Sequence, residues 1–349
     1  MISSPRDVTA PEKAAMSRAL EIATRGPEWG INPRVGCVML DSHGTTVAEG
    51  WHQGSGTSHA EIMALDVLRQ RGMTARGLTA VVTLEPCAHT GKTGPCALAL
   101  AQAGIAKVVY SVPDPGVESG GGAEILINAG VEVDSGLDTE AGTELLERWL
   151  GATTLRRPWT TVKWAMSLDG RAAAADGTSQ WITSPASRHR VHRDRSRHDA
   201  IAVGSGTLLA DNPALTARTP HGELFEHQPL AVVVGKRDVP AGFAVSEHPG
   251  GFYHHRNHDL ATLGNNLFER GVRSLYVEGG PTLASAFLAQ GRVEEVHISL
   301  GPLLLGGPRV AITDLGISTM TDALALDIRD VHTTESDLTV IARPAKKGH

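Results

Sequence analysis

The stretch Thr83-Leu-Glu-Pro-Cys-Ala-His-Thr-Gly-Lys-Thr-Gly-Pro-Cys96 holds two of the three cysteines in this 349-residue chain. Upstream, His59-Ala-Glu61 opens a segment with helical periodicity. One imidazole and two thiolates suit zinc with a fourth position left open, and a glutamate beside them can move protons. The order H-x-E and then P-C with a second Cys is that of zinc deaminases, although eight residues separate the cysteines here. The predicted metal ligands are His59, Cys87 and Cys96, and the predicted catalytic residue is Glu61.

Two other interpretations of this motif remain. Cysteines alone could be buried thiols that behave as small apolar residues. A closed structural zinc site would require a fourth Cys or His, and only His89 stands nearby. The third cysteine, Cys37, lies in an apolar segment and is expected to be packed core, with a ligand role as the alternative. The combined motif favours a catalytic site.

Composition restricts the classes of function. Hydrophobic residues at 41% and charged residues at 20% are typical of a globular protein, and a net charge of −6 provides no general basic field for nucleic acid. Three cysteines make no disulfide framework, which indicates a reducing, cytoplasmic setting. Residues 1–20 carry no signal-type core, and no run approaches 18 apolar residues. We expect a small-molecule substrate, no nucleic acid or membrane partner, and a homo-oligomer.

The length predicts about two domains, which we place at residues 1–152 and 158–349. Strands alternate with helices in both, so the fold class is α/β with sheets covered on both faces. Helices are expected at 7–25, 60–70 (with Ser58 as a plausible N-cap), 97–103, 122–129, 139–152, 185–196, 263–270 and 282–289. A turn into a strand is expected over 32–40, with further strands at 46–51, 78–82, 105–112, 131–133, 160–164, 200–203, 230–234, 274–277, 296–299 and 338–342. A loop rich in Gly, Pro and His is expected around 241–258.

The second half contains weaker signals. Glu278-Gly-Gly-Pro-Thr282 and Gly204-Ser-Gly-Thr207 each follow a strand, and either could be a phosphate-binding turn or only a tight turn. Neither fits the G-x-G-x-x-G dinucleotide pattern. Five arginines between 188 and 197 are interpreted mainly as a solvated helix face, with one or two able to bind an anion. The histidines 254, 255 and 258 are interpreted as exposed loop residues.

Taken together, these segments resemble the bifunctional riboflavin-biosynthesis deaminase–reductase family over nearly the whole chain. The N-terminal half is similar in Asn32-Pro-Arg-Val-Gly36, His59-Ala-Glu61 and the long loop between the cysteines. The C-terminal half is similar in segments 163–171, 179–183, 211–216 and 277–282. One departure is Asp114-Pro-Gly-Val117, where relatives often have Asp-Pro-Asn-Pro.

The resemblance implies a cytidine-deaminase-like three-layer αβα domain followed by a dihydrofolate-reductase-like α/β domain. It also implies zinc-dependent deamination of a diaminopyrimidinone ribosylamino phosphate, and then NADPH-dependent reduction of its ribosyl group to a ribityl chain. The implied substrate-binding residues are Asn32, His89, Lys163, Ser179, Arg195, Leu215, Arg218 and Glu278. The implied NADPH-binding residues are Ala165, Trp181, Thr207, Asp211, Gly280, Pro281, Thr282, Leu283, Ala284, Ser285 and Ala286.

Three alternatives from other classes remain. One is a single-activity zinc deaminase with a non-catalytic C-terminal domain. The others are a nucleic-acid-editing deaminase, against which the acidic balance argues, and a non-enzymatic zinc scaffold, for which a fourth ligand is lacking.

Overall fold

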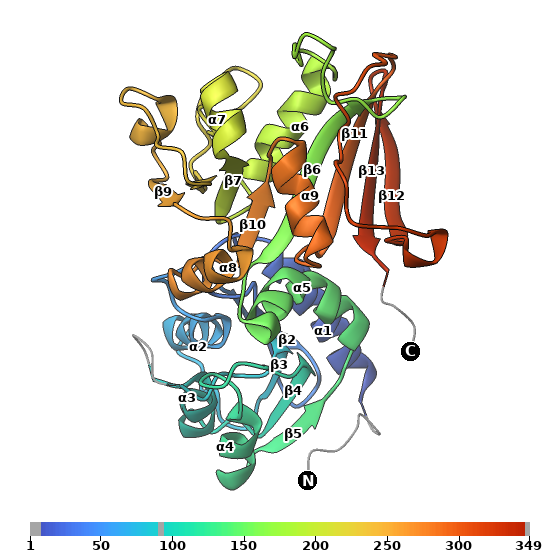
Figure 1. Ribbon diagram of the computed structural model, residues 1–349. Coiled ribbons are helices and arrows are strands. Elements are labelled where there is room, and N and C mark those ends of the chain that lie inside the picture. Colours follow the sequence, from blue (N-terminus) through green and yellow to red (C-terminus); the bar gives the residue numbers. More distant parts are fainter. Residues whose placement is uncertain (1–7, 90–93, 346–349) are drawn as a thin grey trace. The chain divides into compact units, whose positions relative to one another are not determined.

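The computed structural model describes residues 8–89 and 94–345. The chain forms two compact units, Met1–Arg156 and Arg157–His349, each built on its own β-sheet (Figure 1). The expected α/β fold class is confirmed, with one sheet in each unit. Within the described residues no helix has the length and apolar character needed to cross a membrane.

The sheet of the first unit has the order β2-β1-β3-β4-β5. Strand β1 is antiparallel to β2 and β3, whereas β3, β4 and β5 run parallel. Its strands are β1 (Gly36–Leu40), β2 (Thr46–Trp51), β3 (Thr79–Leu84), β4 (Lys107–Val112) and β5 (Glu132–Ser135). Its helices are α1 (Ala10–Ala23), α2 (Ala60–Gln70), α3 (Cys96–Gln102), α4 (Gly122–Asn128) and α5 (Thr139–Leu155).

Helices cover both faces of this sheet, so the unit has three layers (Figure 1). Because successive strand residues point to opposite faces, Val38, Val81 and Val109 pack against α1, and their neighbours pack against α2, α3 and α4. Both faces are apolar, which is why these strands appear in the sequence as continuous apolar runs. The parallel strands β3 and β4 place their carboxyl ends, and the loops that follow, at one edge.

The sheet of the second unit has the order β12-β13-β11-β6-β10-β7-β8-β9. The strands from β11 to β9 are parallel, and β13 and β12 complete the sheet in antiparallel pairing. The strands are β6 (Trp159–Ser167), β7 (Ala200–Gly204), β8 (Leu230–Val234), β9 (Phe252–His255), β10 (Ser274–Val277), β11 (Glu295–Gly301), β12 (Leu326–Thr334) and β13 (Asp337–Pro344). The helices are α6 (Pro185–Arg195), α7 (Ser205–Asp211), α8 (Leu260–Glu269) and α9 (Pro281–Ala289), with short 3-10 turns at Ala244–Glu247 and Met320–Asp322.

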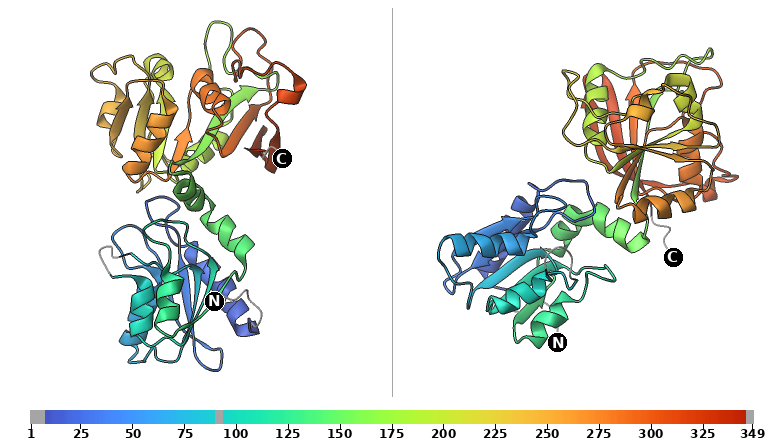
Figure 2. Two further views of the ribbon diagram at one scale, coloured as in Figure 1. Left: turned by 60° about the horizontal axis from the view of Figure 1, so that its bottom comes forward. Right: turned by 90° about the vertical axis from the view of Figure 1, so that its left-hand side faces the viewer.

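Apolar residues of α8 and α9 form one core with this sheet, and residues of α6 and α7 contribute to a second core on the opposite face (Figure 2). The long parallel stretch brings the carboxyl ends of β6, β10, β7 and β8 to a common edge. In open parallel sheets this edge is where ligands bind.

The structure corrects several expectations from the sequence. Helix α5 continues to Leu155, beyond the expected end at residue 152. Helix α7 and strands β9 and β12 were not expected. His254 and His255 are not exposed loop residues, because both lie on β9 and His255 is buried. The arginine segment is not simply a solvated face either, because Arg195 is largely buried. Ser58 is not the N-cap of α2; His59 takes that position.

Candidate active sites

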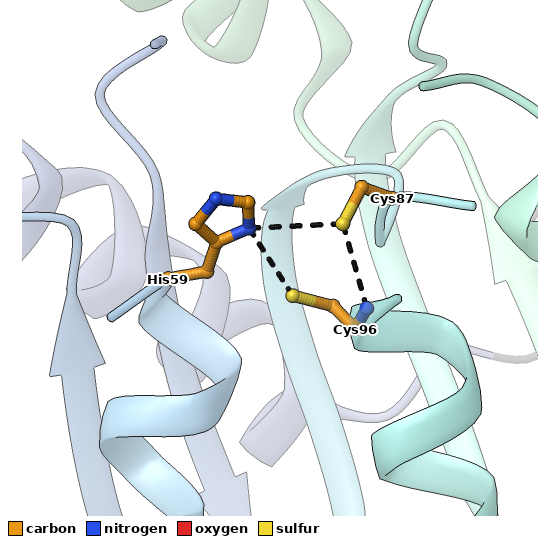
Figure 3. A group of neighbouring side chains, drawn as sticks. All are labelled: His59, Cys87 and Cys96. Carbon is orange, nitrogen blue, oxygen red and sulfur yellow. Dashed lines mark hydrogen bonds between the residues drawn. The ribbon is translucent and has the colours of Figure 1, made fainter. Parts of the chain in front are cut away.

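In the first unit, the three predicted ligand side chains converge at the edge where β3 ends (Figure 3). His59 is the N-cap of α2, Cys87 follows β3, and Cys96 is the first residue of α3. The His59 Nδ1 atom lies 3.6 Å from the Cys87 sulfur and 3.3 Å from the Cys96 sulfur. All three donor atoms lie within 4.8 Å of one another. Residues distant in sequence are thus brought together by three separate elements.

The two thiols alter each other's acidity. The hydrogen bond from Cys96 lowers the pKa of Cys87, and the same contact, together with burial, raises the pKa of Cys96. A divalent cation held by these two sulfurs would require both as thiolates, so its binding would release their protons. One imidazole and two thiolates in this arrangement fit zinc, and among the described residues no fourth His, Cys, Asp or Glu joins the cluster.

Glu61 lies in the first turn of α2, two residues after His59, and is only 4% exposed. Its carboxyl interacts with the Cys96 thiol. Burial, and next the charge of Cys87, raise the pKa of Glu61 to about 7. A carboxyl group is therefore held beside the donor cluster without being one of its ligands.

His52, which the sequence analysis did not single out, connects this cluster to Asn32. Its Nδ1 faces the Ser58 carbonyl at 3.1 Å and therefore donates, which leaves Nε2 to accept from the Asn32 amide at 3.1 Å. Burial lowers the pKa of His52, in keeping with a neutral ring. The ring also meets His59 edge-on, with centroids 5.4 Å apart. The amide of Asn32 is thereby fixed in one orientation.

Glu85 also supports the site, by anchoring neighbouring backbone, and the sequence analysis did not assign it this role. Its buried carboxylate accepts hydrogen bonds from the backbone N–H groups of Asp114, at 3.1 Å, and Ala123, at 2.9 Å. It thus joins the cysteine-bearing loop to the loop of residues 113–121 and to the first turn of α4. His89 extends from the same loop, and its Nδ1 is buried with no hydrogen-bond partner in the described part of the chain.

In the second unit, a cavity of about 1250 Å³ lies at the carboxyl edge of the parallel strands. Three charged side chains from different elements meet on its wall. Arg195 Nε donates to Glu278 Oε2 at 2.8 Å, and Lys163 Nζ lies 3.9 Å from Glu278 Oε1. Burial alone would raise the pKa of Glu278, but the charges of Arg195 and Lys163 outweigh it and lower that pKa to about 2. Burial lowers the pKa of Lys163, and Glu278 partly opposes that effect.

The two glycine-containing turns lie side by side on the same cavity. The backbone N–H of Gly280 donates to Thr207 Oγ1 at 2.9 Å, and a Cβ at Gly280 would approach that oxygen to 2.8 Å. The part of the wall that precedes α9 therefore consists of backbone without side chains, and such a surface is suited to phosphate groups. A large cavity lined by bare turns and cationic side chains fits a dinucleotide such as NADPH.

Most of the residues expected to bind substrate or NADPH in this unit line the cavity, and two do not. The lining residues are Lys163, Ala165, Ser179, Trp181, Arg195, Thr207, Asp211, Leu215, Arg218, Glu278, Gly280, Pro281, Thr282, Leu283 and Ala286. The exceptions are Ala284, which is fully buried in the core, and Ser285, whose hydroxyl accepts from the Thr313 N–H at 2.8 Å. These two residues lie on other sides of α9.

Fold and sites together define a two-domain enzyme, a zinc-dependent deaminase followed by a reductase. Residues 10–112 match the family model for the cytidine and deoxycytidylate deaminase zinc-binding region, and residues 158–340 match that of the RibD C-terminal domain. The chain belongs to the RibD family of bifunctional riboflavin-biosynthesis enzymes.

Similar proteins cover nearly the full chain. The riboflavin biosynthesis protein RibD of Mycobacterium tuberculosis is 45% identical over 88% of this chain and 89% of its own. That of Escherichia coli is 36% identical over 93% and 96%. The solved structure of Acinetobacter baumannii RibD superposes with a TM-score of 0.86 at 35% identity, over 96% of this chain and 99% of that one.

Proposed function

We propose that the first unit deaminates diaminohydroxyphosphoribosylaminopyrimidine and that the second reduces the resulting 5-amino-6-(5-phosphoribosylamino)uracil. These are the two activities in the name of a Thermotoga maritima enzyme whose structure is 33% identical to this chain, with a TM-score of 0.83 over 96% of it. The observation that carries the proposal is the convergence of His59, Cys87 and Cys96 beside the buried carboxyl of Glu61.

In the deaminase, His59, Cys87 and Cys96 would hold zinc, which when bound makes water a nucleophile near neutral pH. Glu61 would take a proton from the attacking water at its carboxylate and give it to the ring nitrogen. It would then carry the proton of the newly attached hydroxyl group to the leaving amine, which departs as ammonia. The amide of Asn32, oriented by His52, and the ring of His89 would bind the pyrimidine or its ribose. Burial of Glu61 supports this role because it excludes bulk water from the proton path.

In the reductase, bound NADPH supplies the hydride. Lys163 and Glu278 would lie at the ribose, and Ser179, Arg195, Leu215 and Arg218 would hold the rest of the substrate. Ala165, Trp181, Thr207, Asp211 and the turn of residues 280–283 with Ala286 would hold the cofactor. The buried ion pair of Arg195 and Glu278 supports this assignment because it fixes the carboxylate in one position.

The deaminase activity is assigned to residues 1–152 and the reductase activity to residues 158–349. The enzyme is a cytoplasmic homo-oligomer, and it acts on a small molecule without nucleic acid.

A coupled assay tests the proposal. The diaminopyrimidine substrate is supplied with NADPH, and ammonia and the absorbance of NADPH are followed together. Wild type should release ammonia and then oxidise NADPH. Glu61→Gln should do neither, and adding the deaminated substrate should restore NADPH oxidation in that variant. Ammonia release without NADPH oxidation, even with added deaminated substrate, would instead indicate a single-activity deaminase.

A further inference from the structure

His192 lies on α6 and lines the second-unit cavity, but it has no role in the site described above. The carbonyl oxygen of Thr216 lies 3.0 Å from the Nδ1 atom of His192. Because a carbonyl can only accept, the proton of the neutral imidazole is on Nδ1, and Nε2 carries a lone pair. In the described part of the chain no protein group hydrogen-bonds to Nε2, and this atom is not among the buried ones, so it is open to the cavity.

Thr216 also orients two guanidinium groups beside this imidazole. Its carbonyl accepts from Arg195 Nη1 at 2.9 Å, and its hydroxyl accepts from Arg218 Nε at 3.0 Å. Leu215, which precedes it, has a φ of 56°, in the left-handed region that residues other than Gly seldom adopt. Strained backbone of this kind is typical of functional sites. One residue thus holds an imidazole and two guanidinium groups on the same part of the cavity wall.

The charges around His192 favour a neutral ring in the absence of a ligand. Burial, and next the charge of Arg195, lower the pKa of His192 below its usual value near 6.5, and Arg218 adds to this effect. The Thr216 carbonyl and the carboxylate of Glu278 act in the opposite direction. Because one carboxylate faces two guanidinium groups, positive charge is in excess beside the ring. An anion that binds here would neutralise that excess and raise the pKa of His192.

The substrate of the proposed reductase carries a suitable anion, the phosphate on its ribosyl group. A phosphate monoester loses its second proton near pH 6, so above about pH 7 it is a dianion that can only accept hydrogen bonds. Nε2 of a neutral His192 is an acceptor as well, and two acceptors cannot form a hydrogen bond. One added proton between Nε2 and a phosphate oxygen turns this contact into a charge-assisted hydrogen bond.

We propose that His192 Nε2 binds the 5-phosphate of the reductase substrate beside Arg195 and Arg218, and that binding takes up one proton from solvent at this contact. The inference rests on the proposed reductase function and adds a substrate-binding residue to it. In the complex the protonated ring donates from Nε2 to a phosphate oxygen and from Nδ1 to Thr216. Affinity for the phosphorylated substrate should therefore decrease as the pH rises above about 7, because the required proton becomes scarcer.

Titration calorimetry on the full chain with NADP⁺ present, at pH 8 in buffers of different ionisation enthalpy, counts the protons taken up on binding. The probe is the reduced product with its 5-phosphoribityl chain, and the same compound without phosphate is the control ligand. Wild type should take up about one proton with the phosphorylated probe and about none with the control ligand. His192→Gln should bind the probe with about no uptake, because an amide donates without titrating. His192→Ala should weaken binding of the probe about 10- to 100-fold.

The matched control variant is His189→Gln, because His189 lies on the same helix and lines the same cavity but forms no hydrogen bond with Thr216. It should keep the proton uptake of wild type. Equal uptake in wild type and His192→Gln, equal uptake with both ligands, or uptake lost in His189→Gln would each overturn the inference. If His192→Gln does not fold, His192→Asn supplies the same comparison.

The same samples separate this inference from the function on which it rests. Wild type that oxidises NADPH with the deaminated substrate, but binds the phosphorylated probe without proton uptake, overturns the role of His192 alone. Wild type that neither binds the probe nor oxidises NADPH overturns the proposed reductase as well.

Discussion

Glu278→Gln should destabilise the second unit, because it leaves two cations facing each other without their carboxylate. The side chain of Glu278 is 20% exposed and contacts Arg195 at 2.8 Å. The pKa of Glu278 is lowered from 4.5 to about 2, and at about 1.4 kcal/mol per pKa unit this corresponds to about 3 kcal/mol. That agrees with the cost of breaking a buried ion pair, about 3–5 kcal/mol.

The stability contributed by Glu278 changes with pH in a definite direction. A lowered pKa in the folded state contributes stability that is fully present above the unfolded value near 4.5 and is lost as the pH falls toward 2. The difference between wild type and Glu278→Gln should therefore be constant from pH 7 to about pH 5 and shrink below that.

Urea unfolding, fitted with a separate transition for each unit, measures this free energy. The control is Asp238→Asn, which breaks an exposed pair with Arg256 and should cost at most about 1 kcal/mol. If Glu278→Gln costs no more than the control at pH 7, the reasoning about the buried pair is wrong.

Two further predictions concern residues that hold the backbone of the deaminase site and of the reductase site in position. Glu85→Ala should leave zinc content unchanged but raise KM for the diaminopyrimidine several-fold, because two backbone N–H groups of the neighbouring segment lose their acceptor. Glu85→Gln should recover part of the loss. Unchanged KM in steady-state assays would refute this anchoring role. Gly280→Ala should weaken NADP⁺ binding in calorimetry by about tenfold or more, because its Cβ would stand 2.8 Å from Thr207 Oγ1 and would displace the turn. Unchanged NADP⁺ affinity in this variant would contradict the prediction.

Local patterns in the sequence were sufficient to predict the three side chains that converge in the first unit, and most core elements. The His59–Cys87–Cys96 cluster consists of characteristic residue types close to the ends of strands and helices. The apolar runs that form strands such as β3 and β8 can be identified directly in the sequence. Strand β12 was missed because its exposed edge position leaves it with a charged, mixed sequence, including Asp327, Arg329 and Asp330. Its identity as a strand comes from pairing with β13.

Tertiary contacts explain what the sequence could not reveal in the sites. The role of His52 depends on a hydrogen bond to Asn32, twenty residues away, which no linear spacing indicates. The resemblance implies NADPH contacts over the whole run 280–286, whereas the 3.6-residue period of the helix places Ala284 and Ser285 toward the protein interior and away from the cavity wall.

Zinc content measured together with ammonia release tests the central claim most directly. Elemental analysis should find about one zinc per chain in wild type and in Glu61→Gln, and far less in Cys87→Ser. Ammonia release from the diaminopyrimidine should occur only in wild type. Full zinc content in Cys87→Ser, or sustained ammonia release by Glu61→Gln, would contradict the account.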